Sequence, residues 1–204
     1  MIISVVNTKG GVTKTTTSMY LASEMKRRYP ERSVLVADLD KQGTATEWAD
    51  LAEDNGQPLP FKVDVSNTKR IARLAEQMGP DDFLVIDTPP GDASVIQAAV
   101  DISDFVIIPT RPSGADTARV WETLKALGPN KLYAVLVVFA RLGTNLLRDT
   151  LATFEAEDIS RFDTIVPLRE KQAKEYGLLP TPDGTYADVL KEMMDAMAAM
   201  EVPA

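Results

Sequence analysis

The sequence predicts an α/β protein with a doubly wound, mostly parallel sheet flanked by helices. Apolar runs rich in β-branched residues alternate along the chain with stretches that have helical periodicity. These runs are continuously apolar, a pattern typical of strands that are buried on both faces of a parallel sheet. Strands that alternate with helices in this way are the sequence signature of a doubly wound domain.

The expected elements follow one another along the whole chain. Strands are expected at residues 2–6 (IISVV), 33–40 (SVLVADLD), 82–88 (DFLVIDT), 104–110 (DFVIIPT), 132–139 (LYAVLVVF) and, as a short one, 163–168 (DTIVPL). Helices are expected at about 14–29, 67–78, 92–101, 114–127, 144–158 and 184–200, with the proline- and glycine-rich residues 177–184 as a loop before the last helix. No repeat, low-complexity tract or linker interrupts the series, so residues 1–204 are expected to form a single domain.

Composition restricts the chemistry that the chain can perform. It has 204 residues, a formal net charge of -8, and neither cysteine nor histidine. Disulfides, thiolate or imidazole metal sites and histidine acid–base catalysis are therefore excluded. Catalysis must rest on carboxylates, lysines, hydroxyls, backbone amides and a cation held by oxygen ligands. No apolar run is long enough to span a membrane, and we expect no signal peptide at the N-terminus.

The segment NTKGGVTKTTTS at residues 7–18 has the parts that a phosphate-binding loop needs. A buried strand leads into it, Gly10 and Gly11 permit a tight turn, and a helix is expected to begin near Lys14. Backbone N–H groups and the helix N-terminus can then converge on an oxyanion. Lys14 can reach the terminal phosphates, and the hydroxyl of Thr15 can bind Mg²⁺. A glycine turn before a lysine- and threonine-rich helix start is the plainer alternative for the motif taken alone.

The loop departs from the usual pattern G-x-x-x-x-G-K-[ST], because Thr8 and Thr13 replace its glycines. What remains, K-G-G-x-x-K-T-T, resembles the deviant Walker A motif of the ParA/MinD family of ATPases. The resemblance implies a P-loop NTPase fold and assigns nucleotide contacts to Lys9, Gly10, Gly11, Val12, Thr13, Lys14, Thr15 and Thr16, with Lys9 as the signature lysine. If residue 13 needs a positive φ, a β-branched side chain costs about 1–2 kcal/mol. Either the backbone there is right-handed, or nucleotide binding is weakened.

Two further segments lie where this family has its switch motifs. VLVADLDKQGTATEW follows the second expected strand and resembles switch I; on a strand, its Asp38 and Asp40 would point to the same side. FLVIDTPPG carries Asp87 at the end of the next strand and resembles Walker B and switch II. Each aspartate alone fits a turn at a strand end, but three matching segments in order favour the ATPase. By resemblance, the Mg²⁺ ligands are Thr15, Asp38 and Asp87, and the catalytic residues are Lys9, Lys14 and Asp40.

Absent features narrow the choice of branch within this family. The iron–sulfur members need cysteines, which the chain lacks, and we expect no N-terminal winged helix because the nucleotide loop begins by residue 9. A MinD-type membrane helix needs basic residues on its polar face, whereas the tail carries acids beside its methionine stripe at residues 193–200. That stripe is more typical of a core or dimer contact. The chain therefore resembles the small ParA type, which segregates plasmids or positions other cargo.

The resemblance implies a functional cycle. ATP joins two subunits into a homodimer in which Lys9 of each reaches the other's phosphates, and the dimer binds DNA without sequence preference. A small partner protein bound to a centromere or cargo stimulates hydrolysis and release. The implied location is the cytoplasm, on the nucleoid and with no membrane contact. Two alternatives stay open, namely a MinD-like membrane-cycling ATPase and a metabolic ATPase or ligase on the same fold.

The C-terminal half contains candidates for adenine and DNA contacts. Pro167 and Gln172 lie in VPLREKQAKEYG, which resembles the family's stretch near the adenine, although an exposed position explains Gln172 equally well. The cations expected to contact DNA phosphates are Arg141, Arg148, Arg169, Lys171 and Lys174, with a solvated charged face as the alternative. Asp116 follows the fourth strand in a segment like the family's P-x-x-x-D motif, and it either faces a dimer or partner interface or favours the helix N-terminus.

Overall fold

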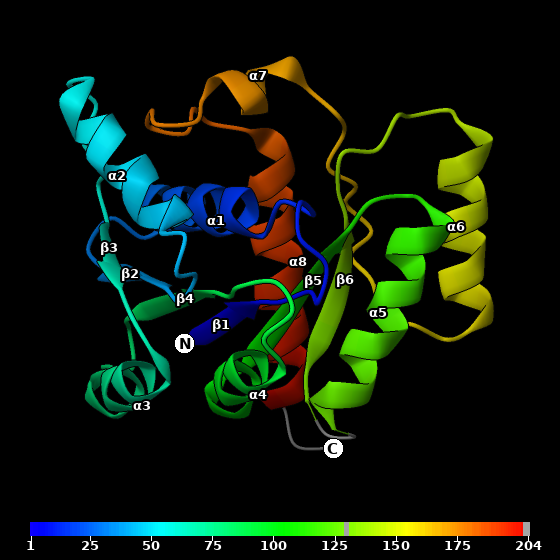
Figure 1. Cartoon of the computed structure of the whole chain (residues 1–204), viewed down its shortest axis with the longest axis horizontal. Coiled ribbons are helices and arrows are strands. Elements are labelled where there is room, and N and C mark those ends of the chain that lie inside the picture. The colour runs from blue at the N-terminus through cyan, green and yellow to red at the C-terminus, as the bar shows by residue number, and fades with distance from the viewer. Residues whose placement is uncertain (129–130, 202–204) are drawn as a thin grey trace.

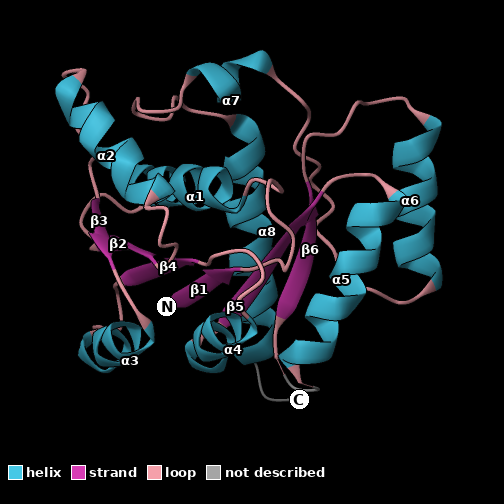
Figure 2. Ribbon diagram, viewed as in Figure 1, coloured by secondary structure: helices cyan, strands magenta, loops and turns pink. Residues whose placement is uncertain are grey.

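The computed structural model describes residues 1–128 and 131–201 and confirms the predicted fold class. A six-stranded sheet has the strand order β3-β2-β4-β1-β5-β6, and helices cover both of its faces (Figures 1 and 2). The strands are β1 (Ile2–Val5), β2 (Val34–Asp38), β3 (Lys62–Val65), β4 (Phe83–Asp87), β5 (Phe105–Thr110) and β6 (Tyr133–Val137). The helices are α1 (Lys14–Arg28), α2 (Thr44–Asp54), α3 (Thr68–Gln77), α4 (Ala93–Ile102), α5 (Gly114–Leu127), α6 (Asn145–Ala156), α7 (Glu170–Lys174) and α8 (Gly184–Glu201).

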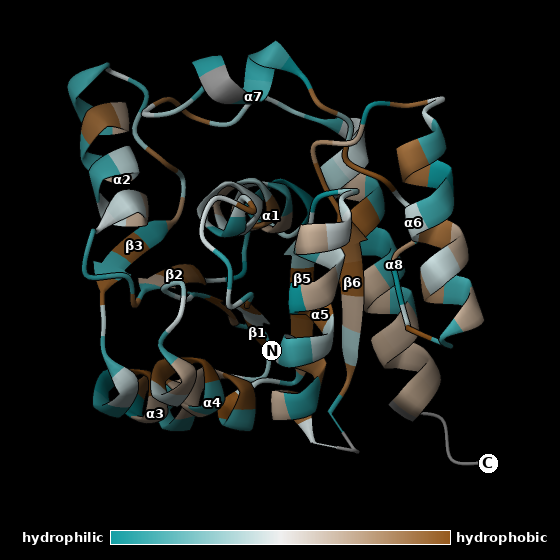
Figure 3. Cartoon of the chain, turned by 45° about the vertical axis from the view of Figure 1, so that its right-hand side comes forward, coloured by the Kyte–Doolittle hydropathy of each residue, from teal (hydrophilic) through white to brown (hydrophobic). Residues whose placement is uncertain are grey.

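Burial of the central strands explains their unbroken apolar sequence. Every residue of β1, β4 and β5 is buried. One face of the sheet packs on α1 and α8, which contribute Met19, Met25 and Val189 to the largest core cluster. The other face packs on α3 and α4 through residues such as Ile71 and Ala99. Figure 3 shows largely apolar colour on the strands of the sheet and a mixture of polar and apolar colour on the surrounding helices.

The strand order places the ends of β2, β4 and β1 side by side. All the strand pairs are parallel, and Asp38 at the end of β2 lies in register with Asp87 at the end of β4. Asp87 in turn lies opposite Val5 at the end of β1. After β3, the chain returns to the middle of the sheet and forms β4 on one side of β1, and it then forms β5 on the other side of β1. The crevice beside β1 is therefore a topological switch point. Ligands of doubly wound proteins bind at such a crevice, outside the carboxyl ends of the strands.

The structure corrects several predicted elements. Strand β3 was not expected, because its residues KVDV alternate apolar with charged side chains at the edge of the sheet. Helices α2 and α7 were also missed, since they are short or rich in small and polar residues. The expected strand at 163–168 is wrong. That stretch makes one isolated bridge, Ala140 to Pro167, and proline has no N–H with which to extend a ladder.

The methionine stripe of α8 belongs largely to the core. Met193 is fully buried, and Met194 and Met197 pack against the largest core cluster, whereas Met200 is 67% exposed. This arrangement agrees with the expected core contact. Among the described residues, no helix has the length and apolar character needed to cross a membrane.

Candidate nucleotide site

Polar contacts hold the loop that follows β1 in place. The Asn7 side chain is fully buried, and its Nδ2 donates a hydrogen bond of 2.9 Å to the carbonyl of Pro109 at β5. Its Oδ1 accepts from the backbone N–H of Lys9 at 2.8 Å. Gly11 has a φ of 72°, which a glycine adopts without strain. The loop therefore turns back sharply at the carboxyl edge of the sheet and enters α1.

The backbone N–H groups of residues 10–16 are free to bind an anion. None of them donates a hydrogen bond to another group in the part of the chain that the structure describes. The first helical bond of α1 comes only at Thr17, whose N–H donates to the Thr13 carbonyl at 2.8 Å. Unpaired N–H groups at a helix N-terminus carry a positive partial charge. The loop thus has the donors and the field of an oxyanion site.

Thr13 adopts a left-handed backbone conformation, with φ 65° and ψ 30°. The alternative of a right-handed backbone at this position is therefore wrong. Thr13 precedes α1 but does not cap it by a side-chain hydrogen bond, and its buried hydroxyl has no partner among the described residues. The buried hydroxyl of Thr8 is likewise unpartnered. Both threonines at the glycine positions of the motif thus carry an unsatisfied polar atom.

Lys14 is buried inside the loop, with its Nζ donating to the Lys9 carbonyl at 3.1 Å. Burial lowers its pKa, and the nearby charges of Asp87 and Asp40 partly offset this effect. An ammonium group without a charged hydrogen-bond partner in such a place gains most from an incoming anion. The position agrees with the predicted contact to phosphate.

Asp87 lies beneath α1 and is fully buried. Its Oδ2 accepts a hydrogen bond of 2.7 Å from the Thr15 hydroxyl, and its Oδ1 accepts one of 3.2 Å from the Ser18 hydroxyl. Burial raises its pKa to about 7, with Asp38 adding to the rise and the hydroxyls and Lys14 opposing it. A carboxylate and a hydroxyl that meet in this way offer the oxygen ligands that Mg²⁺ prefers. The pair of Thr15 and Asp87 therefore fits a hard cation.

Asp38 holds switch I through both of its carboxylate oxygens. Oδ1 accepts from the Asp40 N–H at 3.0 Å, and Oδ2 accepts from the N–H and the hydroxyl of Thr46 at 2.9 and 3.0 Å. Asp38 is 1% exposed, so these bonds satisfy a buried charge. The contact from Thr46 in α2 was not anticipated from the sequence, because α2 itself was missed.

Asp40 lies outside the strand. Because β2 ends at Asp38, the expectation that both carboxylates point to one side of a strand is wrong. The Asp40 Oδ1 accepts from the Gln42 N–H at 2.9 Å in the turn before α2. The charge of Asp40 nevertheless raises the pKa of Lys14, which partly offsets the lowering by burial.

Lys9 forms an ion pair with Asp116 of the same chain. Its Nζ contacts the Asp116 Oδ1 directly; the Lys9 side chain is 40% exposed, whereas that of Asp116 is 5% exposed. Asp116 lies in the first turn of α5, where the N–H of residue 116 is capped by the Ser113 hydroxyl. Lys9 and Asp116 are 107 residues apart in the sequence, so the sequence analysis did not predict this ion pair. The structure therefore holds the signature lysine at its own subunit.

The two candidates for adenine contact, Gln172 and Pro167, differ in burial. Gln172 is 3% exposed, and neither atom of its amide has a hydrogen-bond partner among the described residues. The alternative of a solvated surface glutamine is therefore wrong. Pro167 is half-buried where it bridges to Ala140 beside the end of β6.

Most cations predicted to contact DNA are paired within the chain. Arg169 binds both oxygens of Asp183 at 3.0 Å, and the side chain of Asp183 is 1% exposed. The other pairs are Arg148–Asp149, Lys171–Glu175 and Lys174–Glu170, at 3.5, 3.9 and 3.3 Å. Arg169 precedes the five-residue α7, so the three expected cations do not share one helix face. Arg141 is exposed and has no ion pair within the described residues.

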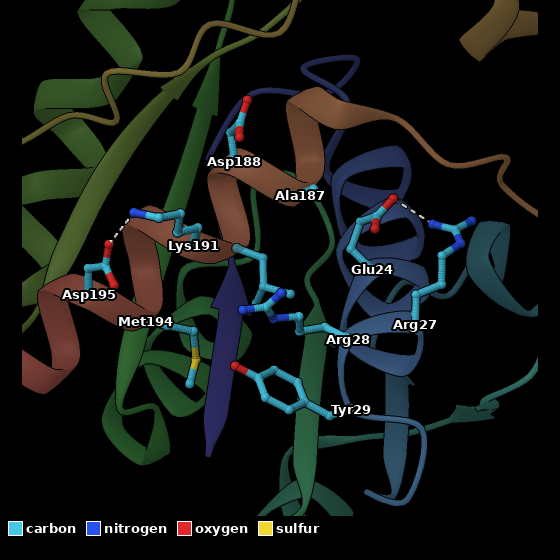
Figure 4. Close-up of a pocket in the computed structure, with 10 residues that line it drawn as sticks. Glu24, Arg27, Arg28, Tyr29, Ala187, Asp188, Lys191, Met194 and Asp195 are labelled. Atoms are coloured by element: carbon cyan, nitrogen blue, oxygen red, sulfur yellow. Dashed lines mark hydrogen bonds and ion pairs between the residues drawn. The ribbon is translucent and has the colours of Figure 1, made fainter.

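A hollow of about 520 Å³ lies away from this site, between the end of α1 and α8 (Figure 4). Within it Arg27 pairs with Glu24, and Lys191 pairs with Asp195 at 2.8 Å. Its charges are largely balanced internally. The phosphate loop therefore remains the stronger candidate for an anion.

Sequence comparisons agree with this geometry. Residues 1–80 match an AAA domain family. The chain is 36% identical over 124 residues to the maintenance of carboxysome distribution protein A of Gloeobacter kilaueensis, across 60% of this chain and 55% of that protein. It is 26% identical over 192 residues to the ParA family protein MG470 of Mycoplasma genitalium, across 72% of this chain and 68% of that protein. These matches support the resemblance of the chain to the ParA/MinD family of deviant Walker A ATPases.

Solved structures share the P-loop NTPase fold with almost the whole chain. The MinD cell division protein of Aquifex aeolicus has a TM-score of 0.73 at 16% identity, covering 95% of this chain and 97% of that chain. Cobyrinic acid a,c-diamide synthase of Mycobacterium smegmatis, with bound ATP analog and magnesium, has a TM-score of 0.73 at 17% identity, covering 98% and 96%. At these identities the likeness establishes the fold alone.

Proposed function

We propose that this protein is a partition or positioning ATPase of the ParA/MinD type that binds ATP together with Mg²⁺ and hydrolyses it. The observation that carries the proposal is the set of free N–H groups at residues 10–16, which surround the start of α1 next to the buried Lys14. A polyphosphate is the ligand that satisfies several such donors and a lysine together. Mg²⁺ would neutralise charge on the phosphates when bound.

The predicted site residues supply distinct functions in this proposal. Lys14 binds the β- and γ-phosphates, and Thr15 and Asp87 hold the cation. Asp38 lies in register with Asp87 but is a weaker candidate ligand, because backbone N–H groups already donate to both of its oxygens, whereas the donors to Asp87 are hydroxyls. The Asp40 carboxylate accepts only one hydrogen bond from the described residues, so it is free to orient the attacking water.

The adenine assignment rests on Gln172. A buried amide without partners is costly, and a ligand with its own donor and acceptor removes that cost. The Watson–Crick edge of adenine has both groups. Pro167 would contribute an apolar contact to the base. Replacing Gln172 with leucine, which keeps the volume, should weaken ATP binding without weakening the fold.

Dimerisation is the step at which Lys9 changes partner. Before ATP binds, Asp116 holds the Lys9 ammonium group within its own subunit. In the proposed nucleotide sandwich, Lys9 leaves Asp116 and reaches the phosphates of the other subunit, in the manner of an arginine finger. The ion pair thus sets an energetic cost that a bound ATP must offset. Hydrolysis stimulated by a small centromere- or cargo-binding protein would return Lys9 to Asp116.

The proposed dimer binds DNA without sequence preference and thereby places a plasmid, a chromosome or another cargo on the nucleoid. In this proposal, residues 1–204 form a single ATPase domain that performs all of these steps. A carboxysome is one example of such a cargo, because the relative from Gloeobacter kilaueensis is named for the distribution of carboxysomes. The membrane alternative is disfavoured by α8, whose Met193 is buried rather than available to lipid. A metabolic ligase on the same fold would need a small-molecule acceptor.

Equilibrium titration with ATP tests the central assignment. Lys14→Ala should abolish binding, because it removes the charge that faces the phosphates. Affinity within about twofold of wild type, a difference of only about 0.4 kcal/mol, would show that the loop is not the phosphate site. Sedimentation of the ATP-loaded protein with anionic vesicles would favour the membrane alternative. ATP-dependent phosphorylation or ligation of a small molecule would favour the metabolic one.

A further inference from the structure

A continuous groove runs along α3 at the edge of the molecule. Two hollows, of about 490 and 470 Å³, share Leu74 and Gln77, and together they extend from Asn67 to the far end of β3. The cations that line this α3 groove are Lys26, Lys62, Lys69, Arg70 and Arg73, and the acids are Asp64 and Asp82. The groove is therefore basic, although the chain has a formal net charge of -8.

Three cations of the α3 groove are not engaged by acids. Arg70 pairs with Asp64 at 2.7 Å, and Lys26 donates to backbone carbonyls at the end of α1. By contrast, no described carboxylate lies within ion-pair distance of Lys62, Lys69 or Arg73, and all three residues are exposed. The cations near α7 are mostly paired within the chain. Three exposed cations without an ion pair among the described residues thus lie together at the α3 groove.

The exposed surface of α3 suits a polar, negatively charged partner. Its apolar side is covered by the sheet and α4, with Ile71 fully buried. None of the large exposed apolar side chains of the described residues lies on α3. Lys69 and Arg73 are four residues apart, so their stems lie on one side of the helix at a rise of about 6 Å. Such a stripe of cations can follow successive backbone phosphates.

We propose that the α3 groove is the surface through which this protein binds the phosphates of duplex DNA. The inference rests on the proposed DNA binding and names its surface, which differs from the predicted cations near α7. Figure 1 shows α3 below the outer end of the sheet and α7 above it, so the two candidate surfaces lie on opposite sides. Because β3 is the edge strand, no further described strand lies beyond it on this side of the sheet.

Fluorescence anisotropy of a labelled duplex of random sequence, with ATP-loaded full-length protein, tests this surface. The variant is Lys69→Glu with Arg73→Glu. The matched control is Lys171→Glu with Lys174→Glu, which changes the charge equally on α7. At about 0.1 M salt we expect the α3 variant to lose at least 100-fold in affinity, and its log–log salt slope to fall by about 0.9 for each lost contact. The α7 control should change less than fivefold.

The outcomes separate this inference from the proposed function. ATP binding and circular dichroism should match wild type in both variants, because all four side chains are exposed. If wild type binds DNA and the α3 variant binds equally well, or the α7 control loses more, the α3 assignment is wrong and the DNA-binding function stands. If wild type binds no duplex even at low salt, both fail. Lys69→Gln with Arg73→Gln, a milder change, should show a smaller loss in the same direction.

Discussion

Replacing Thr13 with glycine should make the protein more stable, although the change removes a side chain. Thr13 has φ 65° and ψ 30°, and an L-residue in this region costs about 1–2 kcal/mol. Its hydroxyl is buried without a partner among the described residues, which adds a penalty of about 1–3 kcal/mol. Glycine removes both penalties.

Two smaller effects oppose this gain. Glycine has greater freedom in the unfolded chain, which costs about 0.5–1 kcal/mol. Loss of the half-buried methyl group costs up to about 0.8 kcal/mol. The expected net stabilisation is about 1–2 kcal/mol, in the lower half of the combined range. For a chain of this size, this corresponds to a rise in Tm of about 2–8 °C.

Thermal and denaturant unfolding should be measured without nucleotide, because a bound ligand would itself shift stability. Thr13→Ala removes the hydroxyl but keeps the Cβ, and should recover only part of the gain. Gly11→Ala supplies the reverse test in the same loop. Gly11 has φ 72°, and an added Cβ would meet no atom within 4 Å, so alanine there should cost about 1 kcal/mol through backbone strain alone. A Thr13→Gly protein that unfolds at or below the wild-type temperature would refute the strain argument.

Further predictions concern the catalytic and switch residues. Lys9→Ala should still bind ATP but should neither dimerise nor hydrolyse it; dimers seen by light scattering with ATP would refute the shared site. Asp40→Ala should accumulate an ATP-bound dimer, with single-turnover hydrolysis slowed about 100-fold or more if Asp40 orients the water. In Mg²⁺-free buffer, wild-type stability should fall as pH rises from about 4 to 7, because the folded state keeps the Asp87 proton up to a pKa of about 7. Denaturant unfolding of Asp87→Asn across this range should lack that dependence.

The sequence alone determined the parts of the molecule that depend on local patterns. Central strands such as β1 and β4 are buried on both faces, so their apolar runs identify them without reference to the rest of the chain. The phosphate loop was also predictable, since its strand, glycines, Lys14 and helix start are contiguous. The edge strand β3 and the short α7 were missed, because neither needs a distinctive apolar pattern to exist.

Tertiary structure decided which charged groups meet. Lys9 pairs with Asp116 across 107 residues, and Arg169 pairs with Asp183. No spacing rule encodes such pairs, since each depends on how two separate elements approach one another in the folded sheet. The sign of the φ angle at Thr13 could not be predicted from the sequence for the same reason. The path of the backbone from β1 to α1 fixes this φ. A β-branched residue therefore adopts a conformation that is intrinsically unfavourable for it.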